Sequence, residues 1–219
     1  MSIDYKKTQK DLYMPKTTPS MIDVPEMVFI MVDGAGNPNT SPDYKAALNI
    51  LYGLSYSIKM TKMSGAQPDG YFDFVVPPLE GLWWFKDGGV ITDILDKDSF
   101  CWTSMIRQPE FVTDEVFEAA KCALSKKKPE LDLSAVRLEK FAEGLCAQIM
   151  HIGPYDDEPA TIAVLEKFIE ESGHASDFTD ARRHHEIYLG DPRKTAPERL
   201  KTVIRYPVKD LKSKEETAL

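Results

Sequence analysis

The predicted fold is organised around one stretch, Arg183-His184-His185-Glu186-Ile187-Tyr188-Leu189. Its side chains alternate in type, as expected for a β-strand with one face towards a core. Ile187 and Leu189 then face that core. The opposite face carries a carboxylate between two rings, namely His184, Glu186 and Tyr188. If this face lines a cavity, Glu186 is the group that any chemistry would use. If it meets water, Glu186 is an ordinary solvated residue.

The composition restricts the class of protein. The chain has 219 residues, of which 42% are hydrophobic, which suits one large domain or two fused small units. A formal net charge of -8 leaves no basic stripe, so nucleic acid is not expected as a partner. No run of about 18 apolar residues occurs, so no membrane span is expected. Three widely spaced cysteines favour reduced thiols in a cytoplasm, and no spacing suggests a metal or another cofactor.

Apolar periodicity and turn residues predict the elements between residues 27 and 208. A doubly buried strand at 27–32 is followed by a loop with Gly and Pro and by a helix that begins at Ser41-Pro42. The other predicted elements are strands at 71–76, 81–85 and 98–107, a turn at 86–89, a helix capped by Thr113, a hairpin of 136–141 with 145–152, a helix with Pro159 in its first turn, a short helix at 195–198 and a last strand at 202–208.

The order strand, helix, strand, strand occurs twice in this prediction. We therefore expect an α+β fold in which two such units form an antiparallel sheet, with the long helices on one face and a concave ligand pocket on the other. The domain is expected to span 21–208, with repeats at about 21–110 and 136–208. Residues 1–20 are polar and interrupted by prolines, so we expect an irregular arm whose removal leaves the domain folded. Residues 209–219 form a charged tail.

Two motifs resemble a known family. His151-Ile152-Gly153-Pro154-Tyr155, a helix, then Glu186-Ile187-Tyr188-Leu189 and a closing strand resemble the gyrase-inhibitor-like (GyrI-like) small-molecule-binding domain. This domain also forms the effector-binding half of multidrug-responsive transcription regulators. The sequence from Glu186 to Pro197 is similar to a stand-alone bacterial branch, in which some members are cyclopropane hydrolases that open the spiro-cyclopropane ring of DNA-alkylating natural products. No helix-turn-helix precedes Met27, so a direct role in transcription is not expected.

The resemblance implies where the site lies. Glu186 would lie at the floor of an aromatic pocket, with Tyr155 near it at the start of a helix. From the residues alone, Tyr155 can equally be a tyrosine that closes a loop onto the core. Trp83 and Trp84 are adjacent in a predicted strand, so at most one of them can line the pocket. The candidate ligand contacts are Trp102, Tyr188, Trp83, Trp84, Met105 and His184.

A carboxylate on an aromatic floor has two uses. It can attract planar cations, each ring adding about 0.5–2 kcal/mol. Burial can also raise its pKa towards neutrality, which suits a general base that activates water. The Tyr155 hydroxyl can donate a hydrogen bond to a developing phenolate or to Glu186. Three functions follow: a hydrolase that detoxifies cyclopropane-bearing alkylators, a non-enzymatic binder of hydrophobic or cationic planar molecules, and a protein-binding module that inhibits a partner such as gyrase.

Overall fold

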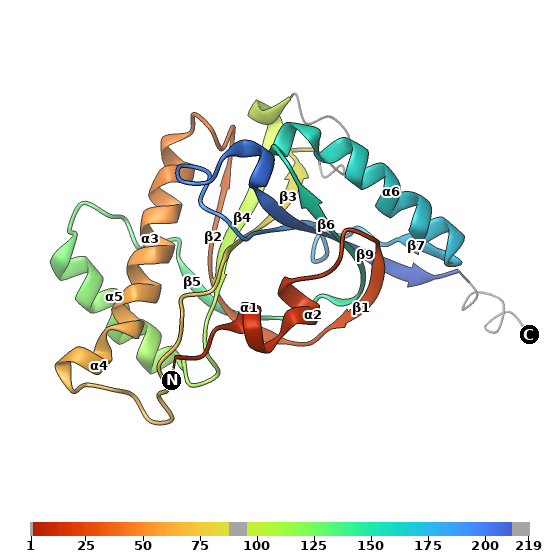
Figure 1. Cartoon of the computed structure of the whole chain (residues 1–219). Coiled ribbons are helices and arrows are strands. Elements are labelled where there is room, and N and C mark those ends of the chain that lie inside the picture. The colour runs from red at the N-terminus through yellow and green to blue at the C-terminus, as the bar shows by residue number, and fades with distance from the viewer. Residues whose placement is uncertain (1, 88–95, 212–219) are drawn as a thin grey trace, which may run out of the picture.

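An antiparallel sheet and its flanking helices make up the described chain, residues 2–87 and 96–211 of a computed structural model (Figure 1). The strands follow the order β1–β6–β9–β8–β3–β4–β2–β5, and β7 pairs with β9. They are β1 (Ser20–Val24), β2 (Met27–Ala35), β3 (Leu79–Phe85), β4 (Phe100–Arg107), β5 (Arg137–Phe141), β6 (Gly144–Ile152), β7 (His174–Ser176), β8 (His184–Tyr188) and β9 (Lys201–Asp210). The α-helices are α1 (Tyr5–Thr8), α2 (Lys10–Tyr13), α3 (Pro42–Lys59), α4 (Thr61–Ser64), α5 (Asp114–Lys127) and α6 (Glu158–Glu171), and the 3-10 helices are η1 (Lys97–Ser99), η2 (Tyr155–Asp157) and η3 (Pro197–Arg199).

The strand–helix–strand–strand unit occurs twice, as predicted. β2, α3, β3 and β4 form the first copy, and β6, α6, β8 and β9 form the second. The strands of each copy follow an equivalent spatial order, β3–β4–β2 and β8–β9–β6, and the copies join through β3 and β8. At this junction Gly81 of β3 lies directly opposite Glu186 of β8. The predicted α+β class with a duplicated unit and an antiparallel sheet is confirmed.

The two long helices, α3 and α6, cover one face of the sheet (Figure 1). Trp83 packs in the core cluster of α3, and Ile204 packs in the cluster of α6. Residues directly opposite each other on paired strands share a face. Ile204 is opposite Glu186 and Trp83 is opposite His184, so Glu186 lies on the face that carries the helices. The pocket that the sequence predicts on the face away from the helices therefore does not contain Glu186.

The other, concave face is filled by the N-terminal arm, around which the sheet curls (Figure 1). Tyr5, Leu12 and Tyr13 are buried there against strand residues of both repeats. The Asp4 side chain accepts a hydrogen bond from the Lys6 N–H and so caps α1. The expectation that the arm lacks regular structure is wrong, because the sheet buries apolar side chains that are too widely spaced to form a local pattern.

Capping residues set the starts of two helices where the sequence predicts them. The Ser41 hydroxyl accepts a hydrogen bond from the Tyr44 N–H, and Pro42 opens α3. The Thr113 hydroxyl accepts one from the Val116 N–H at the start of α5. In the last repeat, Pro159 lies in the first turn of α6, as predicted.

The predicted strand at 71–76 is wrong, since only an isolated bridge between Ile3 and Phe74 forms there. The aromatic residues of this segment pack around one ring instead of joining a ladder. Tyr71, Phe72 and Phe74 lie 5.1, 5.3 and 6.0 Å from the Phe111 ring, centroid to centroid. Pro77 and Pro78 come next, and neither has an N–H to extend a ladder.

The predicted hairpin between 136–141 and 145–152 is also wrong. β5 pairs with β2, whereas β6 pairs with β1 and β9. The connection contains Glu143, whose carboxylate is drawn into the buried face and bound by Arg205 and His185. Gly144 follows with a φ of +69°, which turns the chain away from β5.

Two smaller differences concern the last elements of the chain. The short helix predicted at 195–198 is the 3-10 helix η3, with no side-chain cap. The last strand, β9, extends to Asp210, so the predicted tail begins inside the sheet. Residues 88–89 of the predicted turn and 212–219 of the tail lie outside the described residues. Within the described part of the chain, no helix combines the length and the apolar character needed to cross a membrane.

Candidate functional site

The candidate site centres on Glu186, in the middle of the sheet. Its side chain retains 15% of its accessible surface, whereas that of His184 retains 2%. Glu186 lies between Gly81 on β3 and Ile204 on β9, neither of which carries a polar side chain. The two sheet positions that flank Glu186 are therefore apolar.

A chain of hydrogen bonds holds the Glu186 carboxylate. The Tyr188 hydroxyl donates to Oε2 at 2.6 Å, and the Trp83 Nε1–H donates to the Tyr188 oxygen at 2.9 Å. His184 Nε2 lies 2.8 Å from Oε1. Since an ionised carboxylate only accepts hydrogen bonds, His184 carries its proton on Nε2. A Cβ at Gly81 would lie 2.6 Å from Trp83 Nε1, so glycine is needed there for the indole to reach Tyr188.

Aromatic rings surround this carboxylate on both repeats. Tyr44, on α3, contacts Trp102 edge-on with ring centroids 5.0 Å apart and lies 5.9 Å from Trp83. Tyr155, at the start of η2, meets Tyr188 edge-on at 5.7 Å. The structure thus brings together four of the predicted aromatic residues and adds Tyr44, which the sequence analysis missed.

His151, earlier in the same motif, holds the loop that carries Tyr155. Its Nε2–H donates to the Pro154 carbonyl at 3.0 Å, so its Nδ1 accepts from the Thr161 hydroxyl at 2.8 Å. Burial, with Glu158 and Glu186 nearby, raises the pKa of Tyr155 to about 12. Tyr155 therefore keeps its proton at neutral pH and is available as a hydrogen-bond donor.

A second carboxyl group, Glu158, lies next to Glu186. It is the first residue of α6 and is 3% exposed. Burial and the negative charge of Glu186 raise the pKa of Glu158 well above its ordinary value. Burial alone would also raise the pKa of Glu186, but hydrogen bonds from His184, Tyr188 and Glu158 hold it below its ordinary value. The upward pKa shift that the sequence analysis expects at Glu186 is therefore found at Glu158 instead.

Two of the predicted ligand contacts lie on the opposite face of the sheet. Met105 is fully buried in the cluster that includes the arm. Trp84 packs against the same cluster, and the guanidinium of Arg183 lies 4.9 Å from its ring centroid. Of the two adjacent tryptophans, Trp83 is the one on the Glu186 face.

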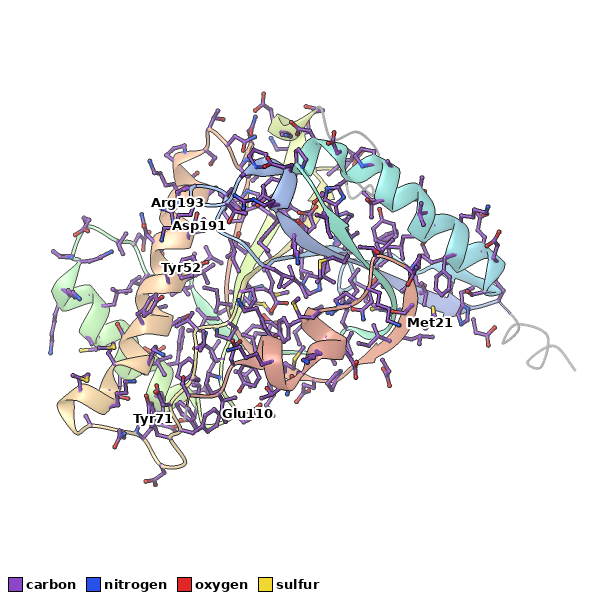
Figure 2. The ribbon with its side chains drawn as sticks, in the orientation of Figure 1. Met21, Tyr52, Tyr71, Glu110, Asp191 and Arg193 are labelled. Carbon is purple, nitrogen blue, oxygen red and sulfur yellow. The ribbon has the colours of Figure 1, made fainter. Side chains whose placement is uncertain are left out.

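The loop after β8 borders this region beside α3. Asp191 and Arg193 form an ion pair there, with Oδ1 and Nε 2.9 Å apart. Figure 2 shows both residues next to α3, with Tyr52 further along that helix. On the side of α6, Lys97 of η1 binds Asp156 of η2 at 2.7 Å.

Glu158 and Tyr44 share a signal that the sequence analysis did not use. Each lies in the first turn of the long helix of its repeat, α3 for Tyr44 and α6 for Glu158. Glu158 also follows Tyr155 by three residues, a spacing that places both side chains on one side of a helical turn.

Comparison with known proteins assigns the family. Residues 17–209 match the GyrI-like small molecule binding domain. This chain belongs to the GyrI-like family. An uncharacterised conserved protein from Listeria innocua is similar over 95% of this chain and 100% of its own, with 50% identity and a TM-score of 0.89. No protein of curated function matches the chain.

Two further crystal structures from Listeria innocua carry the name hydrolase. They are 48% and 49% identical, each with a TM-score of 0.87, and each covers 95% of this chain and 100% of its own. The C-terminal domain of EcmrR shares the fold at 12% identity, with a TM-score of 0.51. The GyrI-like small-molecule-binding domain thus accounts for residues 17–209 of this chain.

Proposed function

We propose that this chain is a hydrolase that opens the cyclopropane ring of planar aromatic alkylating toxins, with Glu186 activating the attacking water. The observation that carries the proposal is the state of Glu186. Hydrogen bonds to both of its oxygens keep it ionised, while 15% of its side chain stays accessible. Its base form is therefore fully populated at neutral pH. The name hydrolase on two proteins of 48% and 49% identity supports the reaction class.

The reaction requires few protein groups. Water attacks the ring CH₂ and a C–O bond forms as Glu186 takes the proton. The strained C–C bond breaks, and its electron pair moves into the conjugated ring and onto the distant carbonyl oxygen. Tyr155, which stays protonated, can donate a hydrogen bond to that oxygen. Relief of strain and gain of aromaticity supply the driving force. The proton taken by Glu186 then passes through water to the phenolate oxygen, so the product is a ring-opened alcohol that carries a phenol and the base is regenerated.

The aromatic residues position the substrate. Tyr44, Trp83 and Trp102 form a continuous group of rings on the first repeat. Trp83 and Trp102 are buried and support Tyr44, which is only partly buried. A planar ligand can stack on such a partly exposed ring, and each aromatic contact contributes about 0.5–1.5 kcal/mol beyond burial. These side chains limit the access of bulk water, so we expect a water bound at Glu186 to be the one that reacts.

The test is product formation. A spiro-cyclopropane dienone is incubated with the protein, and the ring-opened alcohol is measured by mass spectrometry. We expect Glu186→Gln to lower the rate by about 10²–10⁴-fold, because Gln cannot take a proton from water. Glu118→Gln, at an exposed position of α5, is the matched control and should keep the wild-type rate. Turnover by Glu186→Gln at the wild-type rate would show that Glu186 is not the base.

A non-enzymatic binder of planar cations is the second candidate. The observation in its favour is the same ionised carboxylate among aromatic rings, which attract cations. Such a protein would show no turnover. In Trp-fluorescence titrations its Glu186→Gln variant would lose affinity for a cationic rhodamine but keep its affinity for a neutral planar ligand.

A further inference from the structure

Two carboxyl groups in hydrogen-bond contact must share a proton. Glu158 and Glu186 form such a contact between α6 and β8. An ionised carboxylate has no donor, so two ionised groups cannot bond to each other. Two like charges would also repel strongly where both side chains are shielded from water. One of the pair is therefore a carboxylic acid at neutral pH.

The other contacts of the pair decide which group holds the proton. Both Glu186 oxygens accept from strong donors, His184 Nε2 at 2.8 Å and the Tyr188 hydroxyl at 2.6 Å. Glu158 Oε1 is buried and has no hydrogen-bond partner. Lys97, a cation that acts on Glu158, is itself held by Asp156 at 2.7 Å. Donors thus favour the anion at Glu186, and the proton stays on Glu158.

We propose that Glu158 is a positioning residue whose proton sets the basicity of Glu186. While protonated, Glu158 donates a hydrogen bond to Glu186 and makes it a weak base. When Glu158 ionises, Glu186 loses that donor and gains a negative neighbour, so its affinity for the proton of water rises. Glu158 is only 3% exposed, which suits a residue that acts through Glu186 rather than on the substrate.

Other titratable groups face the two carboxyl groups, but we do not expect them to change charge near neutral pH in place of Glu158. The phenols all keep their protons at neutral pH because burial raises their pKa. The ammonium group of Lys97 remains paired with Asp156. The titratable groups that interact with the carboxyl pair from neighbouring elements are Tyr44, Lys97, Tyr155, His184, Tyr188 and Tyr206.

The first measurement needs no substrate. Carboxyl ¹³C chemical shifts of the glutamate-labelled protein are followed against pH. We expect a pair that titrates in two steps, one below and one well above the ordinary glutamate range. Glu158→Gln should remove the upper step and leave the lower one, because the Gln amide still donates to Glu186. Glu118→Gln should leave both. Ionised Glu158 at pH 7 would overturn the proposal.

The second measurement rests on the proposed function. Wild-type turnover should rise about tenfold as pH passes through the upper step, because a stronger base removes the proton of water faster. Glu158→Gln should keep the low-pH rate and lose the rise, which a merely structural residue would not cause. A rate that falls through this window, or a rise retained in Glu158→Gln, contradicts the proposal. If no product forms while the two-step titration is present, the hydrolase assignment fails and the carboxyl pair stands.

Discussion

His185 and Glu186 are consecutive residues of β8, and their side chains enter two different polar clusters. On the arm side, His185 contacts Glu143 through Nδ1 and Glu80 through Nε2, both at 3.0 Å. Arg205 contacts Glu143 at 3.2 Å. On the helix side, Glu186 meets a second carboxyl group and neutral donors. The first cluster balances two anions with two cations, whereas the second places one ionised carboxylate beside a carboxylic acid and neutral donors.

The same residue types, His and Glu, stabilise the fold in the arm-side cluster and are suited to chemistry in the helix-side cluster. Both His185 ring nitrogens face acceptor-only carboxylates, so the ring is an imidazolium. Each charge on the arm side has an opposite charge nearby, and the members are at most 3% exposed. At neutral pH such a cluster holds a single protonation state. The helix-side pair has access to solvent through Glu186 and can gain or lose a proton, which is what a reaction needs.

Deleting residues 1–18 should have the largest effect. The deletion exposes the apolar surface that Tyr5, Leu12 and Tyr13 cover, at about 1.5–3 kcal/mol for each buried side chain. It also removes the Leu12 carbonyl, which accepts from Arg205 Nη2 at 2.8 Å. We expect a loss of roughly 4–8 kcal/mol, measured by urea unfolding. An unfolding midpoint close to that of the full chain would restore the earlier expectation of a dispensable arm.

Raising the pH should weaken the arm-side cluster. Burial lowers the pKa of His185, but Glu143 and Glu80 outweigh it and raise the pKa from 6.5 to about 9. Because the folded pKa is the higher one, this stabilisation is complete below about pH 6.5 and is lost as pH rises through 9. The loss should be on the order of 2–3 kcal/mol. Unfolding free energies at pH 6 to 10 test this, and His174→Gln, outside the cluster, should show the same decline as wild type.

Glu186→Gln should change stability least. Gln is nearly isosteric, and its oxygen can still accept from Tyr188, so we expect a change below about 1 kcal/mol. The same variant is expected to lose turnover. Urea unfolding beside the product assay shows whether both hold. A loss of several kcal/mol would mean that Glu186, like Glu143, serves the fold.

The sequence predicts the faces of single strands better than their partners. Alternation places His184, Glu186 and Tyr188 on one face, and it separates Trp83 from Trp84. Alternation is a property of the local backbone, so it can be read from a short stretch. The duplicated order of elements and the caps at Ser41 and Thr113 are also local signals, and the structure confirms them.

Contacts between distant segments account for what the sequence analysis missed. Glu158 is one acidic residue among several at the start of α6, and only the packing of α6 on the sheet brings it to Glu186. The arm shows no helical or strand periodicity in its apolar residues, because the shape of the sheet decides which of them are buried. β5 and β6 are neighbours in sequence, but Glu143 between them is held by Arg205 and His185, so the strands diverge.

Gly81 and Glu186 face each other where the two repeats join, so one repeat has no side chain at a position where the other has a carboxylate. The two halves of this duplicated protein therefore contribute different groups to the site. The first half contributes Trp83, Trp102 and Tyr44, which shape the space for a ligand. The second half contributes both carboxyl groups. Substitutions in the first half can therefore change which molecules fit without removing either carboxyl group of the second half.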